Sequence, residues 1–241
     1  LSRAAVVYLA WHYTGQAWGM MASFAHLDGL RVEPGERRLF RLSLRIMLVW
    51  HVAWLLEGEE AGGFEYVLTG AYQAASVAMV GAIALGLIGF ARVRRRTGAL
   101  PPLRFSVPWI ALVVWYALIA RYPVAILWVQ LAHCLQYLSF PFRVEKNRRA
   151  VRADKTALSD GAVLALYYVA LVVAGYGIFE FFPLQVAQAI GPWDPGHRIG
   201  HHFQVGFIAL LNIHHYVIDQ VAWKLRDPQV RQELFAHVAP G

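Results

Sequence analysis

Residues 67–91, VLTGAYQAASVAMVGAIALGLIGFA, form an apolar stretch without a single charged side chain. A helix that crosses the hydrocarbon core of a bilayer needs about 20 consecutive, mostly apolar residues. Four arginines follow directly, at positions 92, 94, 95 and 96, and Lys and Arg gather at the cytoplasmic ends of such helices. The stretch therefore predicts a transmembrane helix whose C-terminal end faces the cytoplasm.

The composition of the whole chain agrees with that prediction. Of its 241 residues, 58% are hydrophobic and 15% are charged, whereas a soluble domain has about 25% charged residues. This excludes a disordered, collagen-like or disulfide-rich chain and favours a polytopic membrane protein. The only cysteine, Cys134, has no partner in the chain for a disulfide.

We expect an all-α bundle that forms a single transmembrane domain over residues 1–241. Seven apolar segments are long enough to be considered as spans: 5–26, 40–56, 67–91, 107–121, 123–142, 159–182 and 200–223. The fourth and fifth are separated only by Arg121, Tyr122 and Pro123. Because proline removes a backbone donor, we predict a tight turn there rather than one continuous helix.

The positions of the charges give an orientation to this bundle. All but three of the 22 Lys and Arg residues lie in the segments 27–45, 92–104, 143–155 and 224–231. Seven spans place these segments on one side, so the N-terminus is expected outside and the C-terminus in the cytoplasm. The formal net charge of +7 then reflects topology, and nucleic acid is not expected as a partner. We expect an integral protein of a bacterial inner membrane.

Ten histidines are conspicuous against this apolar background, and several lie inside the predicted spans. Ionisable groups at membrane depth are costly and point to function. His12 and Gln16 share a helical face of the first span, while Gly15 and Gly19 form a GxxxG that would admit a close neighbouring helix. His51 lies in the second span, and His133 shares a face of the fifth with Tyr137.

The last predicted span has the longest polar stripe of the chain. Residues at helical spacing on one face are His201, Gln204, Ile208, Asn212, His215 and Asp219. His202 and His214 flank this stripe. A lipid-facing helix would not carry it, so we expect it to face the interior of the bundle.

These histidines predict a metal site, because neutral imidazole is the commonest metal ligand. The candidate ligands are His12, His51, His133, His201, His202, His214 and His215. Asp219 and Gln16 are candidates to orient ligands or relay protons, and Tyr137 is a candidate to line the substrate channel. Whether the histidines form one cluster or two is open, and interhelical hydrogen bonding is the structural alternative.

Two families of membrane enzymes resemble this chain. The segment 197–202, HRIGHH, reads as HxxxHH and resembles one histidine box of the di-iron fatty-acid desaturases and hydroxylases, although their other boxes are absent. The scattered single histidines are similar to those of bacterial Brp/Blh-type carotene oxygenases, compact polytopic proteins of similar size. That resemblance implies one non-haem iron and a lipophilic substrate.

The sequence thus predicts a metal-dependent membrane oxidoreductase, with non-haem iron as the cofactor and a carotenoid or acyl lipid as the substrate. An electron donor would be a further partner. Haem b and zinc are alternative cofactors, since axial histidines also bind haem iron. The alternative functions are a haem-binding electron-transfer protein and a transporter or proton relay that uses His215 and Asp219.

Overall fold

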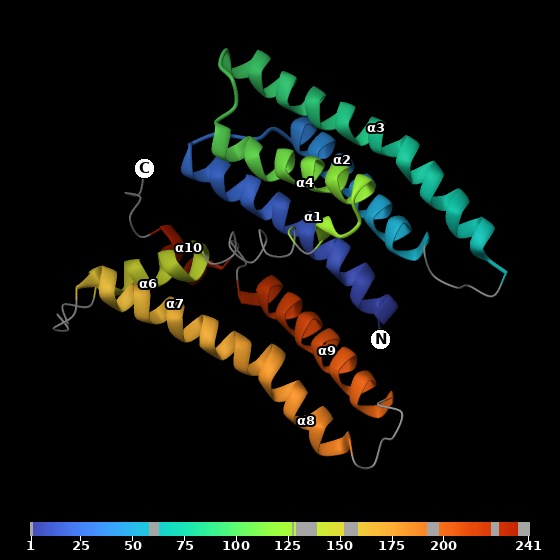
Figure 1. Cartoon of the computed structure of the whole chain (residues 1–241). Helices are drawn as coiled ribbons and strands as arrows, with labels where there is room; N and C mark the ends of the chain where they lie inside the picture. The colour runs from blue at the N-terminus through green and yellow to red at the C-terminus, as the bar shows by residue number, and fades with distance from the viewer. Residues whose placement is uncertain are drawn as a thin grey trace. The chain divides into compact units, whose positions relative to one another are not determined.

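The computed structural model describes most of the chain, and most of the described residues are helical. These ranges are 2–57, 63–126, 128, 139–151, 159–191, 198–222 and 227–235. No strand occurs within them. The chain divides into two compact units, residues 6–133 and residues 134–241 together with 1–5, and Figure 1 shows their helices.

The described part of the first unit contains four long helices. They are α1 (Ser2–Leu27), α2 (Pro34–Glu57), α3 (Glu65–Thr97) and α4 (Leu103–Arg121). Helices α2 and α3 pack along one another (Figure 1). The predicted turn after residue 121 is confirmed, because α4 ends at Arg121 and Tyr122 adopts an extended backbone conformation.

Two ion pairs hold one end of this unit together. The guanidinium of Arg96, at the end of α3, binds both carboxylate oxygens of Glu36 at 2.9 and 3.0 Å, in the first turn of α2. Arg104, at the start of α4, binds Asp28 just after α1. The ends of α1 and α3 therefore lie beside the starts of α2 and α4, as an up-and-down arrangement requires.

Two glycines of α3 allow bulky aromatic side chains into the core of the first unit. A Cβ added at Gly86 would lie 2.1 Å from the Trp109 ring, and one at Gly89 would lie 2.8 Å from Phe40. Trp109 is buried, and its indole N–H donates to Ser43 Oγ at 2.9 Å. The close approach predicted at Gly15 and Gly19 is wrong for the described residues, since nothing lies within 4 Å of either added Cβ.

In its described residues, the second unit contains one long helical rod with a π-helical interruption and three further helices. The rod comprises α7 (Asp160–Tyr176), the π-helical turn η1 (Gly177–Phe181) and α8 (Phe182–Ile190). The other helices are α6 (Ser139–Val151), α9 (Arg198–Ala222) and α10 (Pro228–Phe235). α8 packs on α9, where Gly200 lies against Ala187.

Four helical segments of the described chain are long and apolar enough to cross a membrane. They are Pro34–Glu57, Glu65–Thr97, Leu103–Arg121 and Gly161–Ile190, and they contain most or all of the predicted spans 40–56, 67–91, 107–121 and 159–182. The predicted spans 5–26 and 200–223 coincide with helices α1 and α9, but neither helix is among the four. Most of the predicted span 123–142 lies outside the described residues.

One predicted boundary is wrong for a clear reason. The sixth span was expected to end at residue 182, before Pro183, and an aqueous loop was expected to follow. Instead the rod continues to Ile190, because the backbone widens into a π-helical turn in which Phe182 N–H donates to Gly177 O. Such a turn accommodates a proline that an α-helix would not.

Candidate functional site

His51, on α2, is among the most enclosed polar side chains in the described part of the first unit. It has no exposed surface, and its Nδ1 lies 2.9 Å from the hydroxyl oxygen of Tyr116 on α4. Its other ring nitrogen, Nε2, is buried without a hydrogen-bond partner among the described residues. Buried polar atoms in native proteins nearly always have a partner, so Nε2 requires an explanation.

Aromatic side chains fix the orientation of the His51 ring. The Tyr116 ring meets it edge-on, with centroids 5.1 Å apart, and the rings of Tyr13 and Trp54 lie at 5.8 and 6.1 Å. Trp50 stacks on Tyr116 at 5.2 Å, and its indole N–H donates to Ser76 Oγ at 3.1 Å. The hydroxyl that holds Nδ1 is therefore itself held in place by α2 and α3.

Helix α1 adds two further polar side chains to this unit. His12 is buried, and its ring lies 6.3 Å from the ring of Tyr13, which also borders His51. The Oε1 and Nε2 atoms of Gln16, one helical turn after His12, are buried and have no hydrogen-bond partner in the described part of the chain. Leaving such groups unpaired costs about 1–3 kcal/mol each.

The tautomer of His51 determines what its free nitrogen can bind. If the proton is on Nδ1, it donates to the Tyr116 hydroxyl and Nε2 presents a lone pair, as a metal ligand does. If Tyr116 donates to Nδ1 instead, Nε2 carries the proton and can donate to an oxygen of a ligand. In both cases Nε2 is the atom available to a bound group.

The other predicted ligands do not complete this site in the described ranges. His133 and Tyr137 lie outside the described residues. No group of three or more His, Cys, Asp or Glu side chains that could hold a metal is found among the residues that the structure describes. His51 is therefore the best-defined candidate ligand of the first unit.

The histidine-rich stripe belongs to the second unit, on α9. His201, His202 and His214 are exposed within that unit, and the rings of His201 and His202 lie 6.1 Å apart. The side chains of His215 and Asp219 lie outside the described part of the structure. The predicted ligands are thus divided between the two units.

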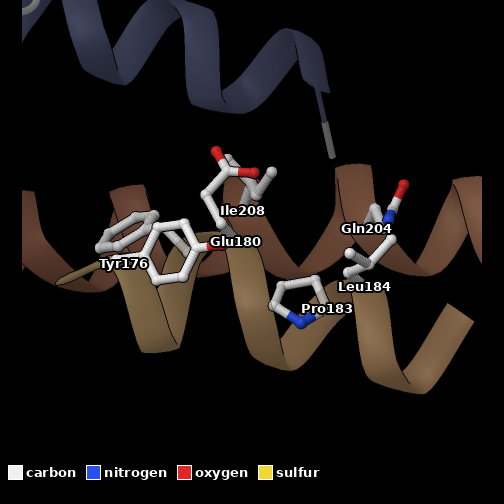
Figure 2. A pocket seen from close by; sticks show the side chains of 7 residues that line it. Tyr176, Glu180, Pro183, Leu184, Gln204 and Ile208 are labelled. Atoms are coloured by element: carbon white, nitrogen blue, oxygen red, sulfur yellow. The ribbon is translucent and has the colours of Figure 1, made fainter. Parts of the chain in front are cut away.

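Two members of the stripe, Gln204 and Ile208, line a cavity of about 300 Å³ against η1 and α8 (Figure 2). The same cavity is lined by Glu180, which the sequence reasoning missed. The sequence does distinguish Glu180, because it is the only charged residue between positions 161 and 190. Tyr116 was missed as well, since a tyrosine in an apolar span is not distinctive without its contact to His51.

No protein-family model, curated protein or solved structure matches this chain.

Proposed function

We propose that the chain is an integral-membrane, metal-dependent oxidoreductase in which Nε2 of His51 is one ligand of a non-haem iron. The observation that carries the proposal is a single ring with Nδ1 anchored and with a buried Nε2 that has no partner among the described residues. Metal-binding histidines characteristically have their second nitrogen oriented by a polar neighbour. The Tyr116 hydroxyl occupies that position for His51.

The remaining ligands are proposed from the histidines that the sequence places at membrane depth. His12 is a candidate second ligand, since the Tyr13 ring contacts the rings of both His12 and His51. His133, His201, His202, His214 and His215 complete the candidate set. The amide of Gln16 is proposed to orient a ligand or to bind substrate, because both of its polar atoms lack partners among the described residues.

The surroundings of His51 favour a lipophilic substrate. The aromatic rings of Tyr13, Trp54 and Tyr116 lie against the histidine ring, so its described surroundings are largely apolar. An imidazole site that keeps open positions is suited to bind O₂ and a substrate at iron. A carotenoid or acyl lipid could reach such a site from the bilayer, and an electron donor would supply the reducing equivalents.

Elemental analysis of gently purified protein tests this proposal. We expect iron to be retained by the natural chain, lost in His51→Ala and reduced about 10- to 100-fold in affinity in Tyr116→Phe, which removes the partner that orients the ring. His26→Ala is the matched control, since His26 lies near the end of α1 on the exposed surface.

Less than about 0.2 metal per natural chain would refute the proposal, because a site with three or four ligands normally retains its ion. Unchanged iron in folded His51→Ala would refute the role of this residue.

One observation favours haem as the second candidate. The described residues contain no group of three ligands, and a haem requires only axial ligands, such as two histidines. In this alternative the chain is an electron-transfer protein in which His51 is one axial ligand. A Soret band in the purified protein that is lost in His51→Ala would favour haem, and iron without a Soret band would favour the non-haem site.

A further inference from the structure

A groove in the second unit runs between the rod and α9. Its volume is about 300 Å³, which is at the lower end of the range for small-molecule sites. Figure 2 shows that Tyr176, Glu180, Pro183 and Leu184 come from one helical segment and that Gln204 and Ile208 come from the other. Phe179 completes the lining.

The backbone along this groove departs from regular α-helix. The π-helical turn Gly177–Phe181 lies within its lining, and π-turns occur often at functional sites. Pro183 has no N–H, so the carbonyl of Phe179, four residues earlier, lacks its usual α-helical donor. Broken helices of this kind form the binding sites of many membrane proteins.

Glu180 supplies the only formal charge in the lining. It lies in the apolar segment Gly161–Ile190 and has no ion-pair or hydrogen-bond partner among the residues that the structure describes. A carboxylate in such a segment is costly, and in membrane proteins it is usually paired or faces a polar cavity. The free energy cost falls if a cation occupies the groove.

We propose that this groove binds a lipophilic amine. Its ammonium group is held by the Glu180 carboxylate and by the faces of Tyr176 and Phe179, since cations are attracted to aromatic rings. The amide of Gln204 accepts a hydrogen bond, and the apolar part of the ligand contacts Leu184 and Ile208. This inference does not depend on the proposed role of His51, which lies in the first unit.

The chemistry of the lining favours an amine over other ligands. A divalent cation prefers six or more oxygen ligands, whereas a single carboxylate lines this groove and its volume far exceeds that of an ion. An anion would be repelled by Glu180, and a neutral lipid would leave the carboxylate uncompensated. An organic cation with an apolar body would compensate the Glu180 carboxylate and fill the volume of the groove.

Equilibrium binding of a matched pair of probes tests the proposal. Tritiated tryptamine carries an ammonium group where tryptophol carries a hydroxyl, and both are offered to the full chain in lipid nanodiscs. We expect tryptamine to bind about tenfold more tightly than tryptophol, which corresponds to about 1.4 kcal/mol. Glu180→Gln should remove this difference and leave tryptophol binding unchanged.

Two control variants separate the groove from general effects of charge and folding. Glu57→Gln removes a carboxylate at the end of α2, and Gln185→Ala removes an exposed glutamine of α8 that does not line the groove; neither should change tryptamine binding. Ile208→Phe should fill the groove and weaken both probes. Equal affinity for the two probes in the natural chain, or an unchanged preference in folded Glu180→Gln, would overturn the proposal.

Discussion

His51 and Glu180 are both ionisable side chains on apolar helices, yet the two units surround them differently. His51 is enclosed by aromatic rings from α1, α2 and α4, and one of its nitrogens is held by Tyr116. Glu180 is exposed within its own unit and lines an open groove. A third of the apolar window of α2 is buried, whereas none of the window in Gly161–Ile190 is.

This difference indicates that close packing holds the helices of the first unit in place more than those of the second unit. Lipid tails are as apolar as leucine, so helices in a bilayer associate through tight packing and hydrogen bonds. The first unit has both, as the contacts of Trp109 with Gly86 and Ser43 show. Substitutions in this unit should therefore cost more free energy than equivalent ones on the rod of the second unit.

The largest contrast is expected for leucine truncation. Leu112 of α4 is 1% exposed and Leu171 of α7 is 38% exposed. Leu112→Ala should lower the free energy of unfolding by about 2–5 kcal/mol, since it leaves a cavity in a packed core. Leu171→Ala should cost less than about 1 kcal/mol, as for most surface positions. Unfolding in mixed micelles, followed by circular dichroism, measures both, and equal losses would contradict the contrast.

A smaller effect is expected when the hydroxyl that holds His51 is removed. Tyr116→Phe leaves Nδ1 buried without its partner, which should cost about 1–3 kcal/mol of unfolding free energy. The control is Tyr176→Phe, because Tyr176 is exposed in the second unit and its hydroxyl can be satisfied by solvent or headgroups. The same unfolding assay applies. A loss in Tyr176→Phe as large as that in Tyr116→Phe would show that enclosure is not the cause.

The last comparison concerns two glycines of one helix, for which changes in stability of opposite sign are expected. Gly86→Ala should destabilise the first unit by about 1–3 kcal/mol, because the new methyl group would force the Trp109 ring to move. Gly81→Ala meets nothing within 4 Å and should stabilise α3 by up to about 1 kcal/mol through helix propensity. Thermal unfolding midpoints in detergent should move in opposite directions. Shifts of the same sign would mean that α3 does not pack as described.

Two pairs of glycines illustrate why the sequence predicted helices better than contacts between helices. Gly15 and Gly19 have the favoured spacing but no close neighbour in the described part of the chain, while Gly86 and Gly89 admit Trp109 and Phe40. The spacing of glycines shows only that one face of a helix lacks side chains. It does not show which residues of another helix lie against that face.

The candidate site was also predictable only in part, because the sequence shows which polar residues lie on a helix but not which residues contact them. His12, Gln16 and His51 were selected because polar groups are costly in apolar helices, and all three have side chains or polar atoms buried in the first unit. The sequence could not supply Tyr116 as the partner of His51, because the two residues are 65 positions apart. Glu180 was overlooked although its isolation in an apolar segment was visible.

The sequence by itself determined that the chain is helical and has long segments apolar enough to cross a membrane, because hydropathy and charge placement are local properties of the chain. Only the tertiary structure decided which polar atoms lack partners. Within the described residues, it left Nε2 of His51 without a hydrogen bond while fixing Nδ1, and it placed Glu180 opposite Gln204 and Ile208 across the groove. Such properties depend on the packing of residues far apart in the sequence, which periodicity on a single helix does not encode.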